Sequence, residues 1–160
     1  MRINNSKTKN IVISVYFLLI VLTLVFTTVF NAFREISINP ALIFIITIFV
    51  YLALFILLFG VTKFFEYDSD GLKVGIMNKG LLSTDYLSSK EHALEFEKKN
   101  LISFKFQNYI IYKRLVLYLL GRHGQKKKEI FNVTLVARKK RKYVKQSLNK
   151  IVRNNRSKKK

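Results

Sequence analysis

The chain contains no cysteine, which excludes disulfide bonds, thiolate metal sites and a cysteine nucleophile. Histidine is scarce as well: His92 and His123 stand in polar segments without a second ligand at metal-binding spacing, so both are interpreted as surface residues. No glycine-rich phosphate loop is present, because nothing like GxxxxGK follows the glycines at 121 and 124. These absences predict a protein without a metal or another cofactor.

Carboxylates are also few, with 9 Asp and Glu against 29 Lys and Arg. Asp68 and Asp70 lie in a predicted hairpin turn, where Asp is expected for backbone reasons. Glu95 and Glu97 share one face of a predicted strand, and alternation on a solvated face explains them as well as a carboxylate pair does. No Ser, His and acidic group forms a recognisable nucleophile set, so we predict that the protein is not an enzyme.

Charge is absent from two long apolar runs, 11–30 and 41–62. About 20 apolar residues in a helix span the hydrocarbon core of a bilayer, so residues 1–62 are predicted to form a transmembrane hairpin. The first run is longer than the apolar core of a signal peptide and lacks a small-residue cleavage site. Asn39 as the cap and Pro40 at the first helical position suit the start of the second span.

Basic residues flank this hairpin unevenly. Three precede the first span, the connecting loop carries Arg34 beside Glu35, and Lys63 begins a segment with twenty-five Lys and Arg. By the positive-inside rule, both termini are predicted to be cytoplasmic, and the protein is predicted to be a multi-pass membrane protein.

From residue 63 the apolar pattern changes to the alternation that is typical of strands. Phe65 and Tyr67 point to one side, an Asp70-Gly71 turn follows, and Leu72, Val74 and Ile76 are predicted to continue the buried face. Residues 81–90 have no clear period and are interpreted as a loop. Further antiparallel strands are predicted at 93–97, 102–107, 115–120 and 130–135.

The last predicted element is an amphipathic helix. Its apolar residues fall at i, i+4, i+7 and i+8, namely Val144, Leu148, Ile151 and Val152. We expect this stripe to cap an open end of the sheet. Residues 63–153 are therefore predicted to form one cytoplasmic domain, and residues 154–160, which contain no apolar side chain, a disordered basic tail.

Four stretches between residues 62 and 153 resemble bacterial pleckstrin-homology-like (PH-like) domains: FFEYDSDGLKVGI, LEFEKKNLISFKF, YKRLVLYL and FNVTLV. The chain departs from that pattern at Glu97, where a proline is frequent, and in the longer loop at 81–90. The resemblance implies a membrane-anchored α+β fold, in which two transmembrane helices precede a small antiparallel β-barrel or bent sheet capped by a C-terminal helix. Such modules generally serve assembly or surface contact rather than catalysis.

Positive charge is concentrated at the end of the chain. Residues 63–121 carry nine basic against seven acidic residues, whereas residues 122–160 carry sixteen basic residues and only Glu129. Clusters of this kind near a span contact anionic lipids, although the excess could equally serve topology and solubility. The predicted contact residues are Arg138, Lys139, Lys140, Arg141, Lys142 and Lys145.

Three functions remain open on this basis. The first is a non-enzymatic interaction or scaffolding module that holds a membrane-protein partner through an open sheet edge or the 81–90 region. The second is a binder of anionic phospholipid or another polyanion, and the third is an accessory subunit of a transport complex. Nucleic acid is disfavoured, because Tyr143 is the only aromatic residue among the basic residues at the end of the chain.

Overall fold

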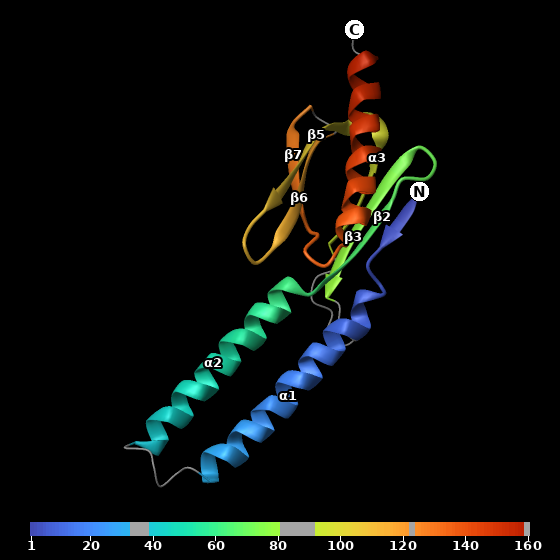
Figure 1. Cartoon of the computed structure of the whole chain (residues 1–160). Helices are drawn as coiled ribbons and strands as arrows, with labels where there is room; N and C mark the ends of the chain where they lie inside the picture. The colour runs from blue at the N-terminus through green and yellow to red at the C-terminus, as the bar shows by residue number, and fades with distance from the viewer. Residues whose placement is uncertain (33–38, 81–91, 122–123, 159–160) are drawn as a thin grey trace. The chain divides into compact units, whose positions relative to one another are not determined.

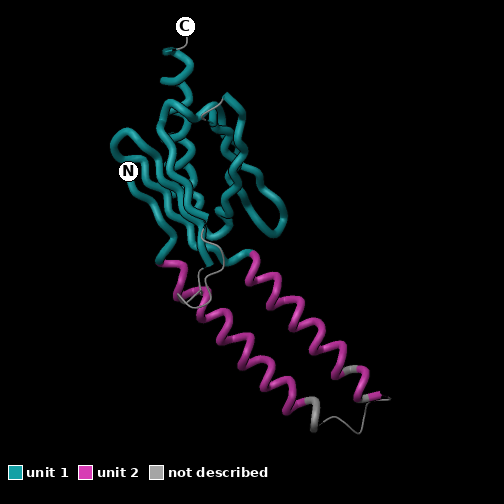
Figure 2. The backbone as a smooth tube through the Cα atoms, turned by 180° about the vertical axis from the view of Figure 1, so that it is seen from behind, with its two compact units in different colours: residues 1–6, 61–160 teal, residues 7–60 magenta. Residues whose placement is uncertain are grey.

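The structure is a computed structural model that describes residues 1–32, 39–80, 92–121 and 124–158 (Figure 1). The chain divides into two compact units (Figure 2). Unit 1 contains Met1–Ser6 and Val61–Lys160, and unit 2 contains Lys7–Gly60.

Unit 2 is built on helices α1 (Thr8–Ala32) and α2 (Pro40–Val61). Both are long and apolar enough to cross a membrane, and hardly any of their side chains are buried in the protein. The predicted helix start is confirmed, since the Asn39 Oδ1 atom accepts a hydrogen bond from the Leu42 amide at 3.3 Å. Thr23 donates its hydroxyl to the Leu19 carbonyl at 2.7 Å, so this polar group is satisfied within its own helix.

Unit 1 contains two antiparallel sheets and a helix. The first sheet has the order β1-β2-β3-β4, with strands Arg2–Asn4, Lys63–Asp68, Lys73–Gly80 and His92–Glu97. A 3-10 turn at Lys98–Asn100 leads to the second sheet, with strands β5 (Leu101–Asn108), β6 (Lys113–Leu120) and β7 (Lys126–Asn132). Helix α3 (Arg138–Ser157) follows. The predicted α+β architecture is thus confirmed.

One hydrophobic core joins both sheets to α3. Phe65 and Tyr67 of β2, Phe131 of β7 and Leu148 of α3 are fully buried in it. All four residues of the predicted stripe on α3 are buried, as the 3.6-residue period indicated. The apolar β6 is the central strand of its sheet, which explains why residues on both of its faces, such as Leu115 and Val116, are buried.

The structure corrects several details of the prediction. Leu72 is 86% exposed, because it belongs to the turn after Asp70 and not to the buried face of β3. Val136 is buried where Leu135 was expected, since β7 ends at Asn132 and the alternation stops there. Helix α3 continues to Ser157, so residues 154–157 are helical rather than a disordered tail. The predicted loop at 81–90 lies outside the described residues.

A further correction concerns the first residues of the chain, which were assigned to the hairpin and instead form β1. This strand pairs antiparallel with β2, Ile3 lying opposite Tyr67. The Asn5 side chain extends the link: its Nδ2 atom donates to the Lys63 carbonyl at 3.0 Å, and its Oδ1 atom accepts from the Phe65 amide at 2.8 Å. Asn5 is almost completely buried, so these two bonds replace water.

Asn5 and the segment from Val61 to Lys63 mark what we call the junction end of unit 1, because the chain passes between the units there. The Asn132 side chain lies at this end, with its Nδ2 atom 3.5 Å from the Val61 carbonyl. Helix α3 also begins at the junction end, since Lys140 Nζ donates to the Asn4 carbonyl at 2.6 Å. The opposite end of unit 1 carries the β2–β3 turn and the last residues of α3.

Candidate functional site

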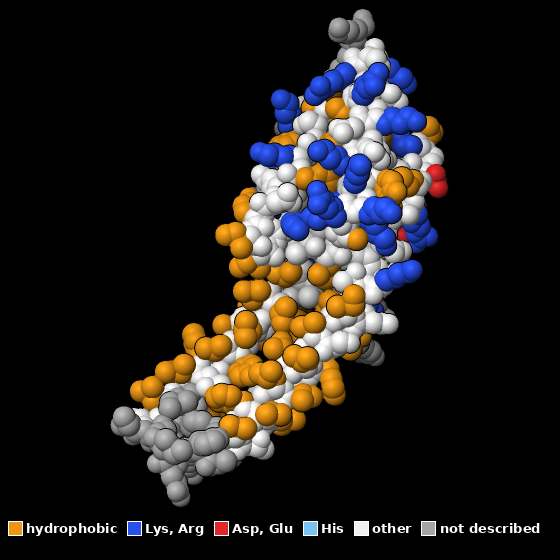
Figure 3. All heavy atoms as spheres, in the orientation of Figure 1, with side chains coloured by type: hydrophobic (Ala, Val, Ile, Leu, Met, Phe, Trp, Pro, Cys, Tyr) orange, Lys and Arg blue, Asp and Glu red, His pale blue; other side chains and the backbone are white. Residues whose placement is uncertain are grey.

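Helix α3 is the most highly charged element of the protein. It carries nine Lys and Arg and no acidic residue, and its blue side chains gather on the face seen in Figure 3. Ala137 provides no side-chain cap, and the first turn contains Arg138, Lys139 and Lys140 near the positive end of the helix dipole. Each cation there costs about 0.3–1 kcal/mol of helix stability. These charges therefore do not serve the stability of the helix.

The six residues predicted as lipid contacts do not form one equivalent group. Arg138, Lys139, Lys142 and Lys145 are exposed, whereas Lys140 and Arg141 are half-buried. The Lys140 ammonium is engaged with the Asn4 carbonyl. The lysines at 126–128 start β7 and lie about 13–20 Å along that strand from its junction end.

Described acidic side chains of unit 1 form ion pairs away from α3. Glu95 pairs with Lys73 at 3.0 Å, and Glu129 pairs with Lys127 at 2.8 Å and His92 at 3.0 Å. Glu97 pairs with Lys99 at 2.7 Å, and this hydrogen bond lowers the pKa of the Glu97 carboxyl. Within the described parts of the chain, none of the observed ion pairs involves α3. The positive charge of α3 is therefore not balanced by ion pairs with the acidic residues that the structure describes.

Part of this charge lines a groove of about 610 Å³ between α3 and β5. The floor contains the half-buried rings of Phe104 and Phe106, which pack against the core. The walls add polar and cationic side chains: Ser103 and Lys105 from β5, and Lys145, Asn149, Arg153 and Arg156 from α3. No acidic residue is among the described residues that line it. The groove thus combines an apolar floor with four cations.

The strand that forms one wall is an edge strand. In the sheet order β5-β6-β7, only one side of β5 is paired among the described strands. An edge strand offers backbone donors and acceptors to an added extended segment. The groove can therefore accept an elongated anionic ligand by backbone pairing, charge attraction and apolar contact together.

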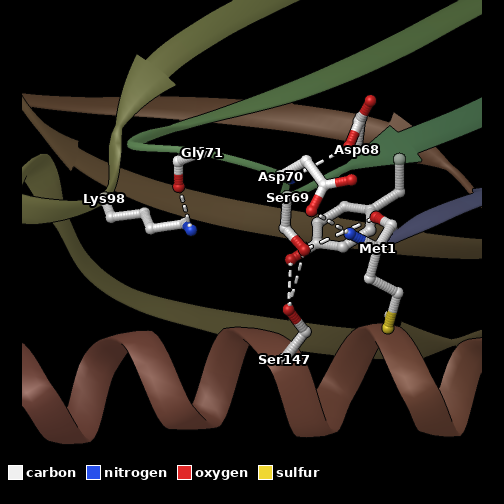
Figure 4. A network of polar contacts seen from close by, with 8 residues as sticks. Met1, Asp68, Ser69, Asp70, Gly71, Lys98 and Ser147 are labelled. Atoms are coloured by element: carbon white, nitrogen blue, oxygen red, sulfur yellow. Dashed lines mark hydrogen bonds and ion pairs between the residues drawn. The ribbon is translucent and has the colours of Figure 1, made fainter.

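Polar contacts hold α3 in position beside this groove. The Tyr67 hydroxyl donates to the Ser147 Oγ atom at 2.9 Å, and the Ser147 hydroxyl in turn donates to Ser69 Oγ at 3.3 Å (Figure 4). Burial raises the pKa of the Tyr67 hydroxyl. Further along, the Asn155 Nδ2 atom donates to the Lys98 carbonyl at 2.7 Å and the Leu101 carbonyl at 2.9 Å. These hydrogen bonds fix the position of α3 and therefore of the basic residues that it carries.

Sequence reasoning found only part of this site. Lys145 was among the predicted contact residues, and Arg153 was recognisable as a cation on the polar face of the helix. Lys105 and Arg156 were missed, because their proximity depends on how α3 packs against β5. The alternation of Phe104, Lys105 and Phe106 indicated a half-buried strand but not its neighbour.

Fold and groove define an α+β protein with two long apolar helices and a cationic groove between α3 and β5. No group of three or more potential metal ligands occurs among the described residues. No family model, curated protein or solved structure matches this chain.

Proposed function

We propose that this protein is a non-enzymatic, membrane-anchored interaction module at the cytoplasmic face of a bacterial inner membrane. Its partner is a membrane protein with an extended acidic segment, which the module holds in the groove between α3 and β5. The observation that carries this proposal is the set of four cations, Lys105, Lys145, Arg153 and Arg156, around an apolar floor next to an edge strand.

The anchoring rests on the two apolar helices and on the strands beside them. Segment Met1–Ser6 before α1 and the segment after α2 belong to the same sheet, β1 being paired with β2. Both ends of a hairpin that is tied in this way must lie on the same side of the bilayer that it spans. The distribution of Lys and Arg then favours the cytoplasmic side for unit 1.

The architecture of unit 1 supports the resemblance to PH-like domains. A four-stranded and a three-stranded antiparallel sheet share one core with a C-terminal helix. The resemblance implies strands that precede a C-terminal helix, and this order of elements supports it, with the apolar hairpin between the first and second strands.

The dimensions of the groove favour an extended ligand. From Lys145 to Arg156, α3 advances about 16 Å, which equals about five residues of a β-strand. Alternate side chains of such a segment would face the Phe104 and Phe106 rings, and the others would meet the cations. A segment with Asp or Glu at every second position meets both requirements.

A second candidate function, binding of anionic phospholipid, is favoured by the position of the α3 start. Arg138, Lys139 and Lys142 lie near the junction end, where about 1 kcal/mol per cation is available from an anionic surface. Arg153 lies about 16–22 Å further along the helix than these three cations, beyond the Debye length of about 8 Å. Lipid contact therefore suits the first turns of α3, and a protein partner suits the groove.

Site-specific photocrosslinking in intact cells tests the proposal. A photoreactive amino acid in place of Ser103 reports on the groove, and the same probe in place of Glu95 on β4 is the control position. We expect one discrete crosslinked membrane protein from position 103, identified by mass spectrometry, and none from position 95.

Matched charge reversals then test the chemistry. Lys145→Glu with Arg153→Glu should abolish the crosslink, whereas Lys139→Glu with Lys150→Glu changes the charge of the same helix equally and should preserve it. Loss of the crosslink in both pairs would show that only net charge matters, which contradicts a specific groove. Lipid adducts at position 103 in place of protein would favour the second candidate.

A further inference from the structure

The tip of the β5–β6 hairpin is the most exposed apolar feature among the described residues of unit 1. We define the 109–112 tip as Tyr109, Ile110, Ile111 and Tyr112. Ile110 is 104% exposed and Ile111 is 56% exposed, and both tyrosines are exposed as well. Turns are normally built from Gly, Pro, Asn, Asp and Ser, because these residues suit turn geometry and water. Two exposed isoleucines between two tyrosines form an apolar surface of the kind that marks a site of contact with a protein or a membrane.

Hydrogen bonds and ring contacts hold this tip in one shape. The Tyr109 amide donates to the Tyr112 carbonyl at 2.9 Å, and the two rings stack with centroids 4.7 Å apart. The Arg114 guanidinium lies over the Tyr109 ring at 4.7 Å and donates to its hydroxyl and to Gln107. The isoleucines are therefore presented outward by a rigid base, so little conformational freedom remains to be lost on binding.

The tip lies at the junction end of unit 1. Its base residue Lys113 accepts a hydrogen bond from the Val133 amide at 2.9 Å, and the neighbouring Asn132 contacts the Val61 carbonyl. Strand β5 runs toward this end and β6 runs away from it, so the turn between them projects past the paired residues Asn108 and Lys113. Figure 1 shows this turn at the same end of unit 1 as the start of β2.

This position brings the tip to a bilayer if the apolar helices span one. Val61 is the last residue of α2, so the chain leaves the hydrocarbon within a few residues of the junction end. Tyrosine is enriched at the level of lipid headgroups, with its ring in apolar surroundings and its hydroxyl in water. Lys113 and Arg114 directly behind the tip provide positive charge for anionic headgroups.

We propose that the 109–112 tip inserts into the headgroup region of the anionic phospholipid bilayer and acts as a membrane contact of unit 1 besides the two helices. Ile110 and Ile111 enter the apolar boundary, the tyrosines lie at the headgroups, and Lys113 meets lipid phosphate. The contact limits the tilt of unit 1 against the membrane surface. The proposal rests on the membrane anchoring of the proposed function, but not on the groove.

The absence of cysteine from the chain permits a clean test with single-cysteine variants of the full-length protein. Ile110→Cys carries an environment-sensitive fluorophore at the tip. Leu72→Cys is the matched control, because Leu72 is also a highly exposed aliphatic residue and lies in the β2–β3 turn at the opposite end of unit 1. Ile48→Cys on α2 reports on insertion of the helix itself. Each is reconstituted at low density into vesicles of phosphatidylcholine and phosphatidylglycerol.

We expect the probe at 110 to be quenched by lipids that carry a spin label near the headgroup and to be protected several-fold from aqueous iodide. The probe at 72 should show the reverse. Equal quenching at 110 and 72, with the probe at 48 protected from aqueous iodide, would overturn the tip contact and leave the anchoring intact. A probe at 48 that iodide quenches freely would refute the anchoring instead.

A second variant tests the chemistry of the contact. Ile111 is exposed and lies outside the core, so a charge at this position does not disturb the core. Ile111→Asp in the Ile110→Cys protein should restore iodide access at 110, while Ile111→Leu should not. Protection at 110 from both iodide and the lipid quencher would mean that protein covers the tip, which would overturn the proposal in favour of a protein contact.

Discussion

The substitution Asn5→Ala provides a direct test of how the beginning of the chain is held. Asn5 is only 2% exposed and bonds to the Lys63 carbonyl and the Phe65 amide through its side chain. Alanine leaves both backbone groups of β2 without these partners. Such a loss costs about 1–3 kcal/mol for each buried group. Because β1 is an edge strand that can open and admit water, we expect the low end of that range, about 2 kcal/mol in total.

Hydrogen–deuterium exchange measured by mass spectrometry on the full chain in nanodiscs detects this change. A loss of about 2 kcal/mol raises the local opening constant about 30-fold, so peptides covering residues 1–6 and 63–68 should exchange correspondingly faster. Peptides from β6 should be unaffected, because β6 lies in the other sheet. Asn10→Ala is the matched control, since Asn10 is exposed and lies just beyond this contact.

Unchanged exchange at residues 63–68 in Asn5→Ala would refute the reasoning. It would mean that β1 does not cover β2 in solution, and that the Phe65 amide has another partner or is open to water already. Equal acceleration in Asn10→Ala would point to a general effect on the start of α1 rather than to the two hydrogen bonds.

Three further predictions concern unit 1. Leu148→Ala should destabilise unit 1 by about 2–5 kcal/mol, because it leaves a cavity under α3. The control Tyr143→Ala, at an exposed position of the same helix, should cost less than about 0.5 kcal/mol. Chemical unfolding in detergent compares the two variants, and similar values would refute the packing of Leu148. Tyr67→Phe should cost about 1 kcal/mol at neutral pH. Because the Tyr67 pKa is raised, the contribution of this hydroxyl to stability is complete below about pH 10 and is lost as the pH rises through the folded-state pKa. Above about pH 10, the free energy of unfolding should therefore fall more steeply with pH in the wild type than in the variant. Parallel curves would contradict this. Gly71 has a φ of 62°, so Gly71→Val should cost about 1–2 kcal/mol or more by thermal unfolding, and an unchanged midpoint would exclude that backbone strain.

Much of the fold could be predicted because it depends on local patterns. The stripe of Val144, Leu148, Ile151 and Val152 needed only the helical period, and the Asn39 cap needed only the residue type before Pro40. The prediction that Leu72 is buried was wrong, because the alternation with Val74 was continued into the turn, where the period of a strand no longer applies.

The candidate site was less predictable. The concentration of Lys and Arg in α3 was evident, but the groove requires Lys105 and Arg156, which are about fifty residues apart in the chain. The β1 strand has only three residues, too few for a period, and its partner begins about sixty residues later. The 109–112 tip is apolar in the sequence, but only its place at the turn between β5 and β6 leaves Ile110 exposed.

The sequence by itself determined the elements whose physical cause is local: two uncharged helices, alternating strands, a turn at Gly71 and an amphipathic helix rich in cations. Tertiary structure alone decided which of these elements meet. It tied β1 to β2 through Asn5, set α3 against an edge strand, and brought the 109–112 tip to the junction end. The reason is that periodicity reports which side of an element is buried, whereas the choice of neighbour depends on the packing of a shared core between residues far apart in the chain.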